Sequence, residues 1–340
     1  MFQQQVDLST RNTLALPARA EFFASVDRVE QLVALTRHPE LAGRRRFVLG
    51  GGSNLVLTGD FSGLVVHMNL KGKSLAGEDG EHFYVAAAGG ENWRDFVRWT
   101  LDEGWPGLEN LSLIPGTAGA APIQNIGAYG VEAGDFLHLV EALDLDTGRP
   151  CTFNVDDCAL AYRDSLFKRE GWHLSGRYAI TRVIFRLPKR WRPRAAYGEL
   201  AAELERGNIT QPTPAQMASA VIALRQRKLP DPLHIPNAGS FFQNPIVSAD
   251  FAAALGKAHP TLPRYPQTDS HVKLAAGWLI EQTGWKGRNL GPVGMYEKQA
   301  LVLVNRGGAT FRDVQNLTRA VREAILARFG VNLVPEPVIL

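Results

Sequence analysis

The sequence predicts an α+β protein that is divided into two or three substructures. Its 340 residues exceed what one ordinary hydrophobic core organises. The first half alternates short strand patterns with helical ones, whereas patterns of helical period prevail from Thr213 onward. Proline-rich patches at 191–193, 212–214 and 260–266 are the best candidates for boundaries or loops.

The first elements follow from hydrophobic period and cap residues. A helix is expected after Ser25, a candidate N-cap, because the apolar residues from Val26 to Leu35 mostly follow the 3.6-residue period. A second helix is expected after Asn92, with Trp93 and Phe96 facing inward. Strands are expected at 46–49, 63–68, 82–88 and 178–187, with a hairpin from 137–145 to about 153.

The second half is expected to be richer in helices. Thr213-Pro214 starts a helix that stops before Pro230. Thr310 caps the final helix, and Gly330 ends it. Two further helices are expected at 248–255 and 275–282, a buried strand at 300–305, and a return of the tail 331–340 to the first substructure.

Composition narrows the class of protein. A hydrophobic content of 45%, a charged content of 21% and a net charge of +3 are typical of a globular protein. The arginines are scattered along the sequence and do not form the basic cluster that is typical of a nucleic-acid-binding protein. Cys151 and Cys158 are not accompanied by other residues in a metal-binding pattern, so we expect free thiols, a reducing compartment and no metal. Since no segment approaches 18 uninterrupted apolar residues, we expect a cytoplasmic protein without a membrane span.

The segment from Ile114 to Gly130 is rich in glycine and small residues and almost free of charge. Because glycine lacks a Cβ, this composition is typical of main chain that runs close to a large, flat ligand. A structural loop at a tight packing junction would explain the same glycines.

A second glycine cluster, Gly50-Gly51-Gly52-Ser53-Asn54, follows a predicted strand. Leu55 stands where a dinucleotide fingerprint needs its third glycine, and strand follows instead of helix, which disfavours a Rossmann fold. Successive main-chain N–H groups, with the Ser53 hydroxyl and Asn54 amide, predict a nest for a pyrophosphate.

Three polar residues are candidates for chemistry. Ser240 lies in an apolar run. A role as a nucleophile with His234 is disfavoured, because the sequence has no G-x-S-x-G elbow. Ser240 could instead donate a proton or occupy a turn, and both roles stay open. Arg163, in Tyr162-Arg163-Asp164-Ser165, offers a fork for a carboxylate, with Asp164 to orient it; a surface ion pair is the alternative. Glu336 lies between two prolines in an apolar tail and is either exposed or held desolvated at a site.

Taken together, the motifs resemble the UDP-N-acetylenolpyruvoylglucosamine reductase family over nearly the whole chain. They occur in the family's order: LGGGSN (49–54), GLENLSLIPG (107–116), PIQNIGAYG (122–130), YRDSLFK (162–168), KLPDP (228–232), GSFFQNP (239–245), KLAAGWLI (273–280) and QALVLVN (299–305). The resemblance implies an FAD-binding fold of the vanillyl-alcohol-oxidase type with two α+β subdomains, residues 1–68 (with 333–340 returning) and 69–212, and a separate substrate-binding domain, 213–332.

The resemblance also implies the reaction and the site residues. NADPH would reduce UDP-N-acetylglucosamine enolpyruvate to UDP-N-acetylmuramate through non-covalent FAD, in a monomeric enzyme. Arg163 and Glu336 would stabilise an enolate-like charge, and Ser240 would deliver a proton. The residues expected to bind FAD are Gly50, Gly51, Gly52, Ser53, Asn54, Pro115, Gly116, Gly119, Ala120, Ala121, Ile123, Asn125, Ile126 and Gly127. Those expected to bind substrate are Tyr162, Tyr197, Arg225, Lys228, Asn244 and Gln299.

The chain departs from the family's pattern at a few positions. Ala120 and Ala121 stand where serines are common, Gln243 where a lysine is frequent, and Val334 where an acid is found. Two other functions stay open at this point: a flavin-dependent oxidase on the same scaffold, and a non-catalytic carrier of flavin or nucleotide sugar.

Overall fold

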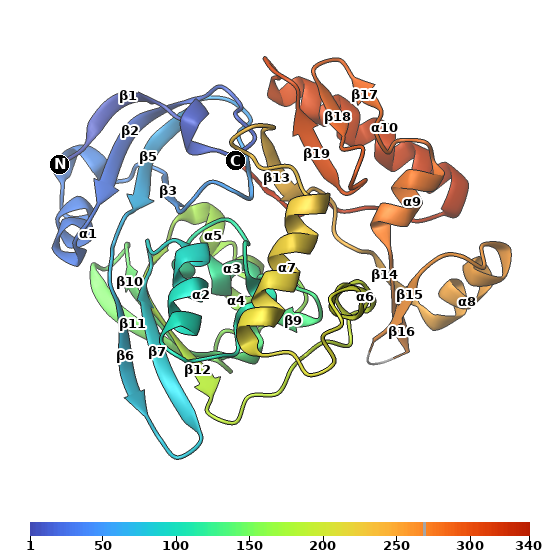
Figure 1. The fold of residues 1–340 in the computed structure, drawn as a ribbon. Coiled ribbons are helices and arrows are strands. Elements are labelled where there is room, and N and C mark those ends of the chain that lie inside the picture. Colours follow the sequence, from blue (N-terminus) through green and yellow to red (C-terminus); the bar gives the residue numbers. More distant parts are fainter. Residues whose placement is uncertain (268–269) are drawn as a thin grey trace. The chain divides into compact units, whose positions relative to one another are not determined.

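The chain passes repeatedly between two units of the computed structural model, which describes residues 1–267 and 270–340 (Figure 1). The first unit comprises residues 1–7, 19–52 and 60–227. The second comprises residues 8–18, 53–59 and 228–340. Both units mix helices and strands, as the sequence predicted.

The first sheet of the first unit has the strand order β1-β2-β5-β3. β1 runs antiparallel to β2, whereas β2, β5 and β3 are parallel, with α1 connecting β2 to β3. The expected helix cap at Ser25 is wrong, because Ser25 pairs with His67 in the β2–β5 ladder and the helix begins after Arg28. The bounds are β1 Gln3–Asp7, β2 Arg19–Val26, α1 Val29–Thr36, β3 Arg46–Leu49 and β5 Phe61–Met68.

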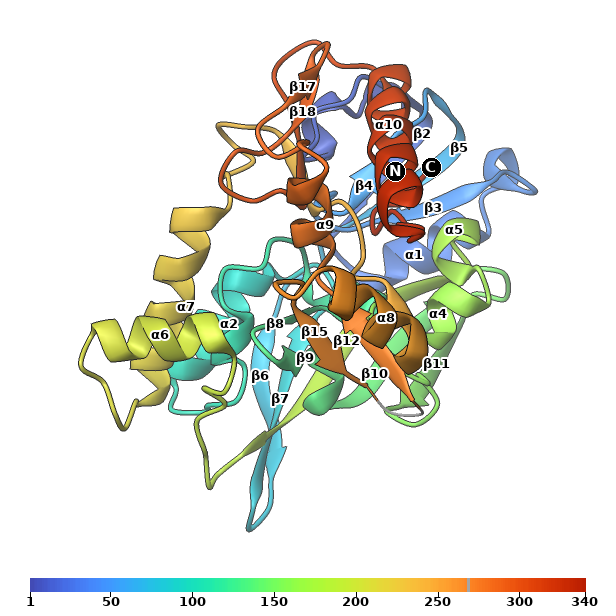
Figure 2. The same cartoon turned by 90° about the vertical axis from the view of Figure 1, so that its right-hand side faces the viewer.

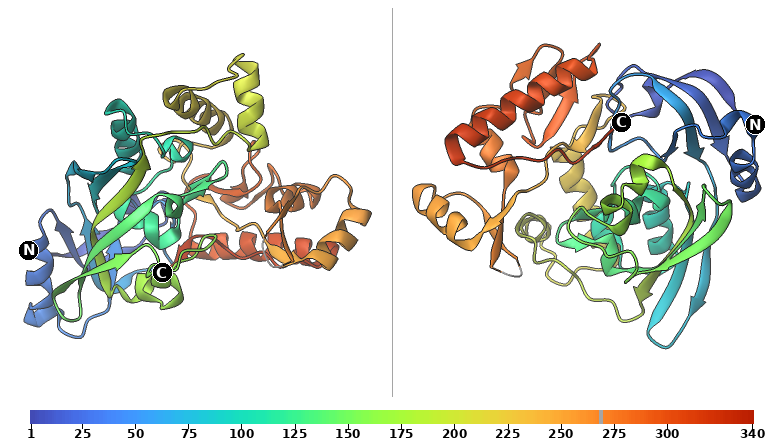
Figure 3. Two further views of the ribbon diagram at one scale, coloured as in Figure 1. Left: turned by 90° about the horizontal axis from the view of Figure 1, so that it is seen from below. Right: turned by 180° about the vertical axis from the view of Figure 1, so that it is seen from behind.

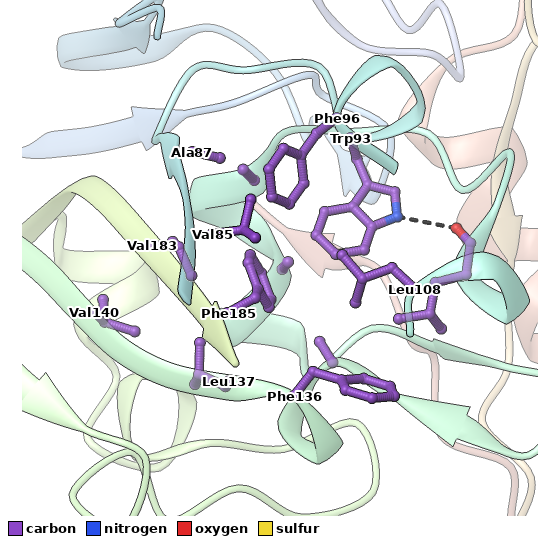
Figure 4. Close-up of a cluster of buried hydrophobic side chains, with 14 of the residues drawn as sticks. Val85, Ala87, Trp93, Phe96, Leu108, Phe136, Leu137, Val140, Val183 and Phe185 are labelled. Atoms are coloured by element: carbon purple, nitrogen blue, oxygen red, sulfur yellow. Dashed lines mark hydrogen bonds between the residues drawn. The ribbon is translucent and has the colours of Figure 1, made fainter. Parts of the chain in front are cut away.

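The second sheet of the first unit is antiparallel, with the order β11-β10-β12-β7-β6. Helix α2 buries Trp93 and Phe96 in the core beside this sheet, where the Trp93 ring lies 5.5 Å from that of Phe185 (Figure 4). The indole Nε1 donates to the carbonyl of Leu111 at 3.0 Å, so this large side chain is buried without an unsatisfied donor. The bounds are β6 Lys73–Glu78, β7 His82–Ala88, α2 Trp93–Asp102, β10 Leu137–Asp144, β11 Arg149–Asn154 and β12 Tyr178–Pro188.

Short elements complete the first unit between and after these strands. Helices α6 and α7 pack through Leu200, Leu204, Val221 and Leu224, and Tyr129 lies against this cluster. The bounds are α3 Ala121–Gln124, β8 Gly127–Ala128, β9 Val131–Glu132, α4 Leu166–Arg169, α5 Trp172–Ser175, α6 Gly198–Arg206 and α7 Pro214–Lys228, whose last residue belongs to the second unit.

The second unit contains a sheet of order β13-β19-β18-β17 and a smaller sheet, β14-β16-β15. Helix α10 runs beside the larger sheet (Figure 3). Thr310 and Asp313 form a capping box at its start and Gly330 ends it at φ +66°, which confirms both predicted ends. The bounds are β13 Asn237–Ser240, β14 Ile246–Ser248, α8 Ala249–Ala258, β15 Arg264–Pro266, β16 His271–Leu274, α9 Ala276–Gln282, β17 Asn289–Leu290, β18 Val293–Met295, β19 Val302–Asn305 and α10 Phe311–Phe329.

The tail of the chain ends in strand β20, Val338–Ile339, which pairs in parallel with β4, Leu55–Val56. The tail therefore returns to a strand within residues 1–68, as predicted, but residues 53–59 belong to the second unit of the structure and not to the first. Across residues 1–267 and 270–340, no helix is both long enough and apolar enough to cross a membrane.

Candidate active site

The two predicted flavin-binding segments of the first unit contact each other through main chain. A Cβ added to Gly51 would lie 3.0 Å from the Cα of Gly116, and one added to Gly50 would lie 2.6 Å from Oγ1 of Thr117. Gly52 and Gly116 have φ values of +62° and +120°, which disfavour other residues. The glycines at these positions are therefore needed for close packing of the two segments.

Gly119 extends this packing to the end of strand β7. Its N–H donates to the carbonyl of Gly89 at 2.9 Å, and a Cβ at Gly119 would lie 2.8 Å from that oxygen. Gly89 is itself confined, since its Cβ would lie 2.0 Å from the carbonyl oxygen of Ile180. The tight packing junction that the sequence left open as an alternative is thus present. The segment from Pro115 to Gly127 is accordingly a strip of main chain with few large side chains.

The turn after this strip is fixed by Asn125, which is buried with φ +43°. Its Nδ2 donates to Glu132 Oε2 at 2.8 Å and to the carbonyl of Ala161 at 2.9 Å, while Oδ1 accepts from the N–H of Gly134. Because both amide atoms are used within the protein, only the main chain of Asn125 suits the flavin contact predicted for it. Ser165, also buried, donates to the carbonyl of Ile123 at 2.7 Å.

Arg163 occupies a tight turn that is closed by reciprocal main-chain hydrogen bonds between Ala161 and Asp164. Its φ of +55° is unfavourable for a residue with a Cβ, and such strain concentrates at functional positions. Nη2 donates to the carbonyl of Gly127 at 2.7 Å, and the guanidinium lies 5.1 Å from the centre of the Tyr162 ring. Asp164, suggested to orient Arg163, instead pairs with Arg169 at 2.6 Å.

Lys168 has a role at this site that the sequence did not assign to it. Its Nζ donates to the carbonyl of Arg163 at 2.8 Å and so supports the strained conformation of the turn. The lysine belongs to the YRDSLFK motif, but nothing in the motif shows that its target is main chain five residues back.

Tyr197 precedes helix α6 and is partly exposed. Its ring meets that of Tyr129 edge-on at 5.5 Å, so the predicted tyrosine loop ends against the glycine-rich region. Asn110 joins the same two segments, because its Nδ2 donates to the carbonyls of Tyr129 and Arg194 at 3.0 and 2.9 Å. Burial raises the pKa of Tyr129, which keeps its phenol neutral.

In the second unit, main chain brings Ser240 and Glu336 into neighbouring positions. Ser240 ends β13, paired with Val302, and the next residue, Phe241, accepts a hydrogen bond from the N–H of Glu336 at 2.9 Å. The N–H of Gln243 donates to the carbonyl of Val334 at 2.9 Å, so the tail lies antiparallel to the segment after Ser240. This pairing holds Glu336 in a defined place although the residues around it depart from the family's pattern.

Asn54 forms hydrogen bonds with the C-terminal segment that contains Glu336 and Val338. Its carbonyl accepts from the N–H of Val338 at 2.9 Å, and its Nδ2 lies 3.5 Å from the carbonyl oxygen of Glu336. Asn244 accepts from the N–H of Ala276 at 2.9 Å and thereby caps α9. Gln299 lies in the turn before β19, where its side chain accepts a long hydrogen bond from the N–H of Leu301 at 3.5 Å.

The predicted site residues divide between the two units, and each unit holds its set on its own elements. The first unit carries Gly50, Gly51, Gly52, Pro115, Gly116, Gly119, Ala120, Ala121, Ile123, Asn125, Ile126, Gly127, Tyr162, Arg163, Tyr197 and Arg225. The second carries Ser53, Asn54, Lys228, Ser240, Asn244, Gln299 and Glu336.

Two family models match the chain. Residues 20–154 match an FAD binding domain, and residues 231–340 match the C-terminal domain of UDP-N-acetylenolpyruvoylglucosamine reductase. A UDP-N-acetylenolpyruvoylglucosamine reductase of Dechloromonas aromatica is 62% identical over 335 residues, which are 98% of each chain. A reductase of the same name from Azoarcus sp. (strain BH72) is 56% identical and covers 98% of this chain and 96% of its own.

A solved structure supports the fold that the motifs implied. The crystal structure of the UDP-N-acetylenolpyruvylglucosamine reductase of Thermus caldophilus matches with a TM-score of 0.69 at 23% identity, over 100% of this chain and 99% of that one. The predicted FAD-binding fold with a separate C-terminal domain is therefore confirmed. Because relatives of more than half identity align along almost its entire length, this chain belongs to the UDP-N-acetylenolpyruvoylglucosamine reductase family.

Proposed function

We propose that this protein uses NADPH and FAD to reduce UDP-N-acetylglucosamine enolpyruvate to UDP-N-acetylmuramate, a step of peptidoglycan precursor synthesis. The observation that carries this function is the 62% identity to a named reductase across 98% of both chains. The strained turn at Arg163 and the paired main chain at Ser240 and Glu336 support it.

The residues expected to bind FAD fit its chemistry. Neither the segment Gly50–Asn54 nor the segment Pro115–Gly127 contains a carboxylate that would repel a diphosphate. Main-chain N–H groups and the side chains of Ser53 and Asn54 are suitable donors, and the strip from Pro115 to Gly127 has few side chains to obstruct a ring. When bound, FAD supplies the hydride-transfer chemistry that protein side chains lack.

The three candidate catalytic residues bind the substrate carboxylate, stabilise its negative charge and supply a proton. The Arg163 fork suits the substrate carboxylate and stabilises the negative charge that develops there during reduction. Glu336 completes the stabilisation of that charge, and the Ser240 hydroxyl donates a proton to the carbon next to the carboxylate. Preorganised groups of this kind contribute about 3–4 kcal/mol each in a site shielded from water.

The remaining assignments belong to the same proposal. Tyr162, Tyr197, Arg225, Lys228, Asn244 and Gln299 bind the nucleotide sugar. FAD lies on residues 1–68 (with 333–340) and 69–212, and residues 213–332 form the substrate-binding domain. The enzyme works as a cytoplasmic monomer, without nucleic acid or membrane partners.

The test is a spectroscopic titration of the purified protein. A yellow preparation should lose its visible flavin absorbance on adding NADPH and regain it, without oxygen, on adding the enolpyruvyl nucleotide. Oxygen consumption with a sugar alcohol would indicate an oxidase. A colourless protein that cannot be reconstituted with FAD would refute the proposal.

A further inference from the structure

Residues 189–197 connect the end of β12 to the start of α6 (Figure 2), and Tyr197 is the last residue of this connection. Its ring meets that of Tyr129 edge-on, with 5.5 Å between the ring centres. Trp191, near the start of the connection, packs against the apolar cluster that α6 and α7 form. The place that Tyr197 can reach therefore depends on how the residues before it are fixed.

The carboxylate of Glu109 binds the first part of this connection. Glu109 is 2% exposed, and its Oε1 accepts a hydrogen bond from the indole N–H of Trp191 at 2.7 Å. Its Oε2 accepts from the main-chain N–H of Gly107, also at 2.7 Å. Because both oxygens are buried and used, loss of the indole donor would leave one carboxylate oxygen unpaired away from water, which costs free energy.

Asn110 binds the connection three residues before Tyr197. This asparagine is fully buried, and its Nδ2 donates to the carbonyls of Arg194 and Tyr129 at 2.9 and 3.0 Å. One carboxamide thus fixes main chain on both sides of the Tyr129–Tyr197 ring contact. The side chain of Arg194 adds a further contact with the same region, since it pairs with Asp135 at 2.6 Å.

The residues that fix the connection are themselves anchored in the core. Glu109 and Asn110 belong to the short 3-10 helix Glu109–Leu111, and the neighbouring Leu108 and Leu111 are fully buried. The buried Trp93 donates from its indole to the carbonyl of Leu111 at 3.0 Å. The hydrogen bonds of Glu109 and Asn110 therefore attach residues 191–194 to the interior of the first unit.

We propose that Glu109 and Asn110 are positioning residues that direct Tyr197 toward the nucleotide sugar. Because they fix the connection as far as Arg194, fewer residues must become ordered when the ligand binds, and less conformational entropy is lost. The inference rests on the proposed function for the role of Tyr197. Its distinguishing consequence is that the effect of Glu109 on ligand binding passes through Tyr197.

The first experiment measures tryptic cleavage after the exposed Arg194 in the flavin-loaded protein, without nucleotide. Trp191→Phe removes the indole donor but keeps an aromatic ring. It should speed this cleavage about 10-fold, because cleavage follows the population in which the connection is detached. Trp172→Phe is the matched control: Trp172 is likewise half-buried in the first unit but packs against Phe167 and Tyr178, and the cleavage rate should stay within about twofold.

The second experiment measures the Kd of the enolpyruvyl nucleotide by calorimetry, without NADPH. Trp191→Phe should raise this Kd about 5- to 30-fold, and Tyr197→Ala should raise it at least as much. Because Trp191 acts through Tyr197, the double variant should bind as Tyr197→Ala alone does, within about twofold. A purely structural role for the hydrogen bond between Glu109 and Trp191 would give additive losses instead.

A second variant of the same hydrogen bond guards against misfolding. Glu109→Gln keeps the size of the side chain, but its single carbonyl oxygen can accept from only one of the two donors. It should speed cleavage and raise the Kd in the same direction as Trp191→Phe. If Trp191→Phe loses its flavin or unfolds, Glu109→Gln takes its place in the cycle with Tyr197→Ala.

The outcomes separate this inference from the proposed function. Unchanged cleavage after Arg194, an unchanged Kd despite faster cleavage, or additive losses in the double variant would overturn the inference. If NADPH fails to reduce the flavin while the losses remain non-additive, the proposed function fails and the positioning of Tyr197 stands. If the enzyme turns over both substrates while the losses are additive, the function stands and the inference fails.

Discussion

Nη2 of Arg163 donates a 2.7 Å hydrogen bond to the carbonyl of Gly127, which joins the strained turn to the end of the glycine-rich segment. Gly127 has no space for a side chain on that side. A Cβ there would lie 3.0 Å from Nη1 of Arg163 and 2.9 Å from the carbonyl oxygen of Val131. The place of the guanidinium is therefore set by the absence of a single methyl group.

Gly127→Ala should displace Arg163 and slow reduction of the nucleotide sugar about 10- to 100-fold, because a small misplacement of a positioning group has large effects on rate. Stopped-flow measurement of flavin reoxidation by the substrate tests this. Gly130→Ala is the control: its φ is +79° with open space around it, so backbone strain should lower stability by about 1–2 kcal/mol without a comparable loss of rate. Equal rate losses in both variants would contradict the explanation.

Lys168→Met should lower kcat more than it raises KM, because the lysine supports the main chain of Arg163 and is not proposed to touch substrate. A loss of about 10- to 100-fold is expected from one hydrogen bond between a charged donor and a carbonyl. Lys168→Arg should restore part of the rate. Arg169→Met alters the ion pair with the neighbouring Asp164 and serves as the control, with little expected change in either constant.

Ser240→Ala should leave reduction of the flavin by NADPH nearly unchanged, while reoxidation by the enolpyruvyl substrate falls about 10²- to 10⁴-fold through loss of the proton donor. The two half-reactions are measured separately under anaerobic conditions. Ser248→Ala is the control within the second unit, because Ser248 caps α8 by accepting from Phe251. It should cost about 1 kcal/mol of stability and leave both half-reactions intact. Equal loss of both half-reactions in Ser240→Ala would contradict its assignment.

Cys158 should make the protein less stable in alkaline solution. Burial raises the pKa of its thiol from 9.0 to about 12, so in this range the unfolded chain releases the proton and the folded protein does not. Below pH 9 both states hold the proton and the thiol adds no pH dependence. Above it, the free energy of unfolding falls by up to about 1.4 kcal/mol per pH unit. Urea unfolding of Cys158→Ala should show a shallower decline than the unmodified protein between about pH 9 and 11.

The sequence predicted those helices and strands that are specified by residues within them. Asn92, Trp93 and Phe96 define α2 by cap and period, and Thr310 and Gly330 mark both ends of α10. Strand β6, Lys73–Glu78, was not predicted, because its residues are mostly exposed and lack an apolar alternation. The short strands β14–β18 were also missed, since pairing with distant segments determines runs of two to four residues.

The motif resemblance placed Arg163, Ser240 and Glu336 in the chain, but not the contacts that hold them. The sequence does not show that Asp164 would bind Arg169, or that Lys168 would bind the carbonyl of Arg163. For the segment that contains Gly119, the sequence left open whether the glycines face a ligand or pack tightly, and only the structure shows that Gly51 and Gly119 pack against protein main chain. These relationships join segments far apart or depend on backbone angles, which residue patterns do not specify.

The second unit is assembled from three separate stretches of chain, residues 8–18, 53–59 and 228–340. Thr13 donates to the carbonyl of Asn237 at 2.6 Å, Asn305 donates to that of Leu14 at 2.9 Å, and β20 pairs with β4. A gene fragment starting at residue 228 would encode Ser240 and Glu336 without these supporting strands and loops. The unit therefore cannot be exchanged between relatives as a simple cassette, and chimaeric enzymes would need all three stretches from one parent.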